Sequence, residues 1–395
     1  MNLENLTPAM KQYLQMKQQN PDCILLFRIG DFYEVFFEDA KICASVLDLI
    51  ITSKNKNSEN PIPMAGIPHH SIEKYIPRLI AKGYKVAIAE QMTDPVPWKI
   101  VERSIKSIIT PGTYIQENQR ELSTLLAITR SSEKSGTNYH LAWWDFTIGN
   151  YQTKTLSNLE QAQKLILSLR PTEIILDSDL TNKEEIIGPI QSYLNCLVSV
   201  YGVPFDPEHT ILTVCKVQQL ASFGKALTEW RASALALLFA YIQHTQQQVL
   251  KNVNTISYHA ADGLVLMDET TVRNLEIFSS SYENSSKYTL FEILNTTKTA
   301  WGARLLRDIL SNPTNNKTEL NWRLSHLERL FDDTKTSAIH QFFSAFFDIP
   351  KLLSLILYRK LNYIPFIKLR TTLWLVLEGL DGEILTQLKT IGLEQ

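Results

Sequence analysis

The stretch ILLFRIGDFYEVF, residues 24–36, decides how the chain begins to fold. Residues 24–27 form a continuous apolar run of the length that suits a buried strand. From Asp31 onward the apolar residues recur every three or four positions, which predicts a helix. They are Phe32, Phe36, Ala40, Cys43 and Leu47. A buried strand that leads into a helix indicates an α/β unit.

Outward from this stretch, the first unit is predicted to extend to Pro111-Gly112. Thr7-Pro8 is a suitable N-cap and first-turn pair for a short helix. We expect a second strand at 47–52, an exposed loop at 53–60, a helix at 72–82, and strands at 85–89 and 104–110. Residues 61–68 hold too many prolines to be predicted as a regular element.

The rest of the chain divides into two further predicted units. Residues 113–252 are predicted to be a second α/β domain, and residues 253–395 a mostly α-helical domain. In the second domain the patterns predict strands at 139–144, 148–155 and 174–176, and helices at 159–169 and 225–252. If 139–144 is a strand, Trp143 and Trp144 point to opposite faces, so at least one ring lies in the core.

Composition limits the class of protein. A chain of 395 residues, 44% hydrophobic and 20% charged, is long enough for two or three packed domains. No stretch resembles a signal peptide or a membrane span, so we expect a cytoplasmic protein without a membrane partner. The formal net charge is −2, whereas a protein that binds DNA by electrostatic attraction alone would be expected to carry a clear positive charge. The cysteines, which are expected to be buried thiols, are Cys23, Cys43, Cys196 and Cys215.

Several motifs together resemble one family. They occupy residues 29–36, 61–70, 90–95, 110–113, 268–276 and 299–306. In their order and spacing the chain resembles bacterial MutS-family DNA mismatch repair proteins, whose Phe-x-Glu signature matches Phe32 and Glu34. The resemblance implies an α/β multidomain fold. Residues 1–112 would be the mixed α/β mismatch-recognition domain, 113–252 a ribonuclease-H-like connector, and 253–395 an incomplete all-α core, or lever, domain.

The resemblance also implies which partners and cofactors to expect. The partner is mismatched double-stranded DNA, with a MutL-type repair protein and a homodimer in full-length members. Those members also carry a DNA clamp and an ATPase domain that uses ATP and Mg²⁺. This chain has no GxxxxGK[ST] motif, since Gly224-Lys225 is followed by Ala226 and has Gln219 where the first glycine should be. We therefore expect a binding fragment rather than an enzyme, with no cofactor of its own.

Phe32 and Glu34 have the chemistry of a mismatch probe. An aromatic wedge that unstacks base steps meets less resistance where pairing is already broken. A carboxylate two residues away can accept a hydrogen bond from a displaced base and repel intact DNA. The residues alone allow a structural alternative, in which Asp31 and Glu34 form a helix capping box and Phe32 is core.

Other candidates are weaker. By resemblance, Lys54 and Arg103 contact backbone phosphates, and Met64 and Ile29 pack in the groove beside Phe32. His69-His70 is a poor metal motif without a third ligand. Two alternative functions remain open: a structure-specific nuclease that uses Asp145, Asp177 and Asp179 of the connector, and a scaffold that binds repair proteins.

Overall fold

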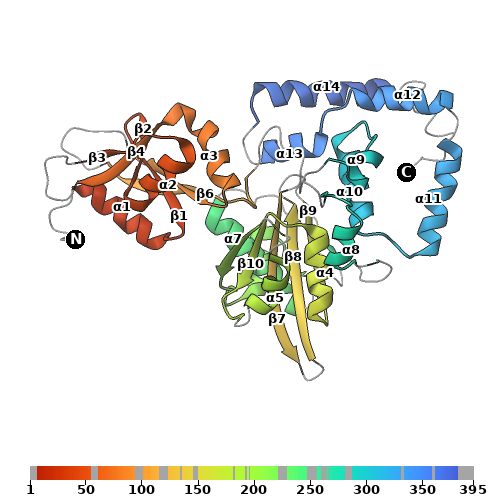
Figure 1. The fold of residues 1–395 in the computed structure, drawn as a ribbon, viewed down its shortest axis with the longest axis horizontal. Coiled ribbons are helices and arrows are strands. Elements are labelled where there is room, and N and C mark those ends of the chain that lie inside the picture. Colours follow the sequence, from red (N-terminus) through yellow and green to blue (C-terminus); the bar gives the residue numbers. More distant parts are fainter. Residues whose placement is uncertain are drawn as a thin grey trace.

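The computed structural model consists of two six-stranded sheets with their covering helices and a helical part (Figure 1). It describes residues 7–54, 61–93, 101–114, 123–133, 136–145, 150–180, 183–191, 194, 196–220, 229–246, 256–258, 265, 267–280, 287–330, 333–357 and 361–380. Among these residues no helix is long and apolar enough to cross a membrane.

The first sheet has the strand order β3-β4-β2-β1-β5-β6. The strands are β1 (Cys23–Ile29), β2 (Phe32–Phe36), β3 (Thr52–Lys54), β4 (Ile62–Pro68), β5 (Lys85–Gln91) and β6 (Arg103–Ile109). Helices α2 (Phe37–Leu47) and α3 (Ile72–Ala81), the latter preceded by the 3₁₀ turn η2 (His69–Ser71), pack on one face through Ala40, Cys43 and Leu79. Helix α1 (Pro8–Gln19) packs on the other face through Met10 and Tyr13.

Three predictions for this unit were wrong. The helix begins at Phe37 rather than near Asp31, and Phe37 has a φ of +55° at the break between β2 and α2. The strand predicted at 47–52 is the end of α2 and its left-handed cap Asp48, with β3 starting only at Thr52. The proline-rich stretch forms β4. A strand can hold proline at its ends or where the missing N–H faces away from a neighbour, and β4 lies beside the three-residue edge strand β3.

The second sheet has the order β11-β10-β7-β8-β9-β12. Strands β7 (Thr124–Glu133), β8 (Gly136–Asp145) and β9 (Asn150–Leu156) form an antiparallel meander. Strand β10 (Glu173–Asp177) pairs parallel with β7 and with β11 (Leu197–Tyr201), and β12 (Ile256–Tyr258) pairs parallel with β9. The covering helices are α4 (Leu159–Leu169), α5 (Lys183–Gln191), α6 (Pro207–Cys215) and α7 (Glu229–Gln246).

Each face of this sheet has its own core. Trp143 packs with α4 and α5, and Trp144 packs with α6 and α7, so the prediction of one ring per face is confirmed. The described part of the predicted long helix is α7, and the remainder of 225–252 lies outside the described residues. Strand β12 extends this sheet beyond residue 252, where the sequence had suggested the third unit would begin.

The third region is helical in its described residues. It contains α8 (Glu269–Asn274), α9 (Leu290–Leu294), α10 (Ala300–Ser311), α11 (Lys317–Leu330), α12 (Asp333–Ser344), α13 (Ile349–Leu357) and α14 (Tyr363–Leu380). Thr299 caps α10 by accepting a hydrogen bond from the Gly302 N–H, as expected for threonine at this position. Leu352 and Leu355 of α13 and Leu369 of α14 join the core on the α7 side of the second sheet.

A buried carboxylate secures the junction between the first two units. Glu173 is fully buried and accepts hydrogen bonds from Gly112 N (3.1 Å), Ser199 Oγ (2.7 Å) and Tyr241 Oη (2.5 Å). A Cβ at Gly112 would lie 2.7 Å from Leu125 Cδ1 and 2.9 Å from Glu173 Cβ, so this turn requires glycine. The two sheets are therefore linked by a well-packed joint rather than by a loose connection.

Candidate nucleic-acid interface

A tight hairpin places Phe32. Ile29 and Phe32 are paired across β1 and β2, which leaves Gly30-Asp31 as a two-residue loop. Gly30 adopts a φ of +58°, and glycine is favoured at the first loop position of such a hairpin because it has no Cβ to clash. Phe32 is therefore the first residue after the tip of the hairpin.

The pleat of β2 then separates two phenylalanines on one face. Phe32, Glu34 and Phe36 alternate onto the α1 side of the sheet. Phe36 lies under α1 and is 1% exposed, with its ring 4.9 Å from that of Tyr13. Phe32 lies beyond the end of this core and is 48% exposed. The same face is thus buried at one end and open to a large partner at the other.

The Phe32 ring lies beside Gly66 of β4. A Cβ built at Gly66 would be 3.6 Å from Phe32 Cδ1, an ordinary van der Waals contact. Gly66 itself is exposed and pairs with Glu34. Glycine therefore leaves the surface beside the ring without a side chain. The sequence motif contained Gly66, but its spatial relation to Phe32 was not foreseen because β4 was not predicted.

Glu34 is half-buried and pairs with Phe27 of β1. The Arg103 guanidinium lies over the Phe27 ring, 5.0 Å from its centroid. Partial burial lowers the pKa of Arg103, and the charge of Glu34 opposes that shift. The arginine thus supplies positive charge close to the carboxylate.

The capping-box alternative is wrong. Residues Phe32 to Phe36 form a strand, so Asp31 cannot be the N-cap of a helix that contains Glu34 at its third position. The Asp31 carbonyl instead accepts hydrogen bonds from the backbone N–H of His69, at 2.9 Å. The purely core interpretation of Phe32 also fails, because nearly half of the side chain is exposed.

The remaining predicted contact residues lie at different distances from Phe32 along the strands. Ile29 lies directly opposite Phe32, whereas Met64 pairs with Phe36, and both pack against the α1-side core. Arg103 uses its guanidinium to donate to Arg28 O (2.7 Å) and Val101 O (3.0 Å). A contact between Arg103 and a DNA phosphate remains a prediction.

Lys54 is not brought close to Phe32. It pairs with Ile62 at the start of β4, whereas Phe32 pairs with Pro68 at the end of that strand. Six residues of strand separate these positions by about 20 Å. The side chain of Lys54 lies outside the described part of the chain, and its phosphate contact remains a prediction.

A polar hollow that the sequence did not predict lies at the same end of the sheet. Its volume is about 330 Å³, and Arg28, Glu90, Gln91, Met92 and Thr93 line it. The Arg28 guanidinium is 5.4 Å from the centroid of the Tyr33 ring, and the Tyr33 hydroxyl donates to Glu90. Met92 is largely exposed. Residues 90–95 were recognised as a motif, but only the pairing of β5 with β1 places them near the hairpin.

The carboxylates proposed for a nuclease do not converge. Asp145 pairs with Thr124 at the start of β7, whereas Asp177 ends β10, one residue beyond the Leu176–Ile128 pair. This offset of five residues along the strands corresponds to about 16 Å. A site for two catalytic metal ions needs carboxylates that converge on ions only about 4 Å apart. Asp179 is an exposed turn residue beside Asp177, so it does not close this gap.

The described residues contain no group of three or more His, Cys, Asp or Glu side chains that could hold a metal ion. His69 and His70 lie in η2, with ring centroids 5.7 Å apart. The prediction for the cysteines is confirmed for Cys23 and Cys43, which are buried. Cys196 and Cys215 are only partly buried, so the prediction overestimated the burial of these two thiols.

Comparisons with known proteins agree with this arrangement. Family models described as MutS domain I, MutS domain II and MutS domain III match residues 7–118, 123–254 and 270–391. The DNA mismatch repair protein MutS of Lactococcus lactis subsp. cremoris is 34% identical over 397 residues, covering 98% of this chain and 45% of the relative. The DNA mismatch repair protein HexA of Streptococcus pneumoniae is 33% identical with the same coverage.

The chain therefore spans about half the length of the curated relatives that it matches. The three family models follow one another along it in the order of the two sheets and the helical region. The chain belongs to the MutS family, of which it contains domains I, II and III.

Proposed function

We propose that this chain recognises mispaired or unpaired bases in duplex DNA, with Phe32 as the wedge and Glu34 as the discriminating acceptor. The observation that carries the proposal is the exposure of Phe32. Large aromatic side chains contribute most when buried, so one left 48% exposed at the tip of a rigid hairpin is available to a partner. The relatives named as mismatch repair proteins support the same function.

The physical step is the insertion of the Phe32 ring between base steps. Unstacking costs a few kcal/mol for paired bases and less where pairing is defective. Ile29 is the cross-strand neighbour of Phe32 on β1, and the ring lies beside the bare backbone of Gly66. A wedge on a hairpin anchored in a six-stranded sheet transmits force to the DNA instead of yielding, because the sheet does not deform easily.

Glu34 then distinguishes defective from intact DNA. It points to the same face as Phe32, two residues further from the tip. A base displaced by the wedge can donate a hydrogen bond to the carboxylate, which offsets the repulsion between Glu34 and the phosphates. Paired bases offer no such donor. The guanidinium of Arg103 lies over the neighbouring Phe27 ring. Its positive charge partly offsets the repulsion between the Glu34 carboxylate and the DNA phosphates.

We propose corresponding roles for the other two domains. The second sheet is a ribonuclease-H-like connector, supported by an antiparallel meander followed by a strand parallel to the first strand of that meander. The third region is an all-α core. The activity of the chain is binding rather than catalysis, without a cofactor of its own. A MutL-type protein and a second copy of the full-length protein are its proposed partners.

Competitive binding tests the proposal. The chain is titrated into a labelled duplex with one unpaired T and challenged with unlabelled duplexes of the same sequence, with and without that base. We expect the unpaired base to compete several-fold better, because the wedge meets less stacking resistance there. Equal competition by the two duplexes at low salt would contradict mismatch recognition and leave the scaffold as the better account.

The nuclease alternative is tested in the same samples. Incubation with Mg²⁺ should leave the labelled strands intact, since Asp145 and Asp177 are offset by about 16 Å along the strands and cannot share a pair of metal ions. Cleavage that disappears in Asp145→Asn and persists through purification would overturn this part of the proposal.

A further inference from the structure

Gly66 occupies a position in β4 where the fold itself does not require glycine. Its φ lies outside the left-handed region, and residues 62–68 form a strand around it. Among the described residues, apart from its chain neighbours, a Cβ built on Gly66 meets only Phe32 Cδ1 within 4 Å, at an ordinary contact distance of 3.6 Å. Neither backbone strain nor lack of room therefore excludes a side chain at this position.

The other glycines of residues 1–112 have such an internal reason. Gly30 and Gly83 adopt φ values of +58° and +81°, which favour glycine. A side chain at Gly112 would collide with its neighbours. Glycine in the interior of a strand weakens the strand, and without an internal reason it often marks a place where a ligand or another backbone comes close. Gly66 is such a glycine.

The space over Gly66 is bounded by the two residues proposed to contact DNA. Gly66 pairs with Glu34, and Phe32 lies two residues before Glu34 on the same face of β2. Gly66 itself is exposed, as is nearly half of the Phe32 side chain. An exposed ring, a carboxylate and a bare main chain therefore lie together on one face of the sheet.

Strand β4 is also open along its outer edge at this point. Among the described residues, β3 pairs with β4 only from Ile62 to Met64, so residues 65–68 have no neighbouring strand on that side. A large partner can therefore approach Gly66 both from the face that carries Phe32 and from the edge of the sheet.

We propose that one strand of the DNA lies directly on the main chain of β4 at Gly66 when Phe32 enters the duplex. This inference rests on the proposed function, since it needs DNA at Phe32. A side chain at residue 66 would meet the sugar–phosphate backbone before the ring is fully inserted between the bases. The bare main chain at Gly66 thus sets how far the wedge can enter, which makes Gly66 a determinant of mismatch recognition.

Substitution of Gly66 separates this role from a role in folding. Valine suits strands better than glycine, so Gly66→Val should unfold at the same urea concentration as wild type or at a higher one. The same variant should bind a duplex with one unpaired T about tenfold more weakly or worse, and its preference over the matched duplex should fall toward one. Gly66→Ala adds only the carbon that contacts the Phe32 ring, so it should lose a smaller part of the preference.

Gly202→Val is the matched control. Gly202 directly follows β11, is likewise exposed and has no positive φ. In the described part of the chain, a Cβ there would meet only Ser178 Oγ, at 3.5 Å, apart from its chain neighbours. Because Gly202 belongs to the second domain, this variant should keep the wild-type preference for the unpaired base.

Insertion of the wedge is followed with 2-aminopurine placed beside the unpaired T, since the fluorescence of this base rises when it is unstacked. Wild-type protein and Gly202→Val should raise the fluorescence on binding, whereas Gly66→Val should not. All measurements use the full chain at equal salt.

The expected result is a preference that falls as the side chain at residue 66 grows, in variants that remain as stable as wild type. Wild-type preference and fluorescence in Gly66→Val would overturn the inference. So would an equal loss in Gly66→Ala and Gly66→Val, because contact with the ring rather than bulk would then be responsible. Unfolding of Gly66→Val at lower urea would show that the fold itself requires glycine, which also overturns it. A wild-type chain without any preference for the unpaired T would contradict the proposed function, and this inference with it.

Discussion

Replacing Phe32 and Phe36 by alanine, one at a time, separates a binding role from a core role within one strand. Truncation of a fully buried phenylalanine usually costs about 3–5 kcal/mol in the free energy of unfolding. Phe36 is 1% exposed and packs edge-on against Tyr13, so Phe36→Ala should cost this full amount. Phe32 is 48% exposed. Because only about half of its surface is buried, Phe32→Ala should cost less than roughly 2 kcal/mol.

The assay is urea unfolding of both variants, followed by competition between duplexes with and without an unpaired T. Phe32→Ala should remain folded at 25 °C and lose its preference for the unpaired base. Phe36→Ala should be the less stable protein, and whatever fraction remains folded should keep the preference. A cost for Phe32→Ala equal to that for Phe36→Ala would refute the exposed wedge, and so would a preference that survives the loss of the Phe32 ring.

Three further predictions concern the whole chain. Purified protein should show no ATP turnover, because its sequence lacks a glycine-rich phosphate loop, and a phosphate-release assay in which activity follows the protein through purification would contradict this. Affinity for DNA should be weak and fall steeply between about 50 and 200 mM salt, as phosphate contacts do, whereas nanomolar binding at high salt would disagree. Glu173→Gln should lower the free energy of unfolding by about 1–3 kcal/mol, because the new NH₂ group faces hydrogen-bond donors of Gly112, Ser199 or Tyr241. A urea unfolding curve unchanged from wild type would contradict a stabilising role for Glu173 at the junction of the two sheets.

Several of the predicted helices and strands are present, among them the strands at 85–89 and 174–176. The helix predicted at 159–169 matches α4, and the helix predicted at 72–82 ends within one residue of α3, because both have clear apolar stripes. Strand β4 was missed because the number of prolines does not show whether each proline nitrogen faces a neighbouring strand, where an N–H donor is needed, or faces away from it. The apolar stripe from Phe32 to Leu47 satisfied helical spacing, yet its first five residues form β2. Spacing alone cannot separate a short strand from the first turn of a helix.

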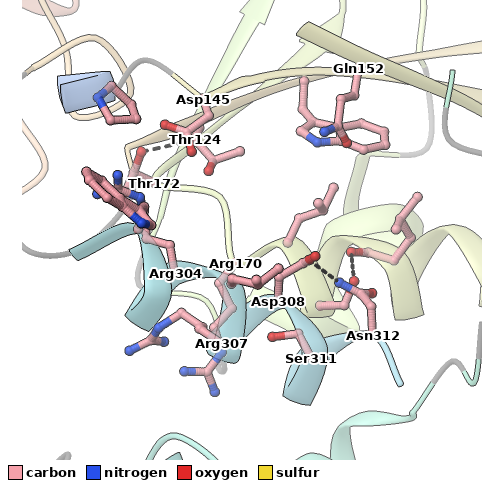
Figure 2. Close-up of a pocket in the computed structure, with 17 residues that line it drawn as sticks. Thr124, Asp145, Gln152, Arg170, Thr172, Arg304, Arg307, Asp308, Ser311 and Asn312 are labelled. Carbon is pink, nitrogen blue, oxygen red and sulfur yellow. Dashed lines mark hydrogen bonds between the residues drawn. The ribbon is translucent and has the colours of Figure 1, made fainter. Parts of the chain in front are cut away.

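The candidate site was predicted in its residues but not in its geometry. Phe32, Glu34, Ile29 and Arg103 do gather at one end of the sheet. The proximity of Gly66 to Phe32 and the hollow around Arg28 depend on strand pairing between segments far apart in the chain. A cavity of about 670 Å³ between the second sheet and α10 lies between two domains (Figure 2), and its lining comes from two distant segments, residues 124–172 and 301–350. No local pattern in the sequence encodes such contacts.

The most direct test of the central claim compares Glu34→Ala and Glu34→Gln for the ratio of affinities toward mismatched and matched duplexes at equal salt. In Glu34→Ala, matched DNA should bind more tightly because the carboxylate no longer repels phosphates, while mismatched DNA gains less or loses affinity. The ratio should therefore fall toward one, with Glu34→Gln intermediate because it keeps an acceptor without the charge. A ratio unchanged from wild type in both variants would contradict the account.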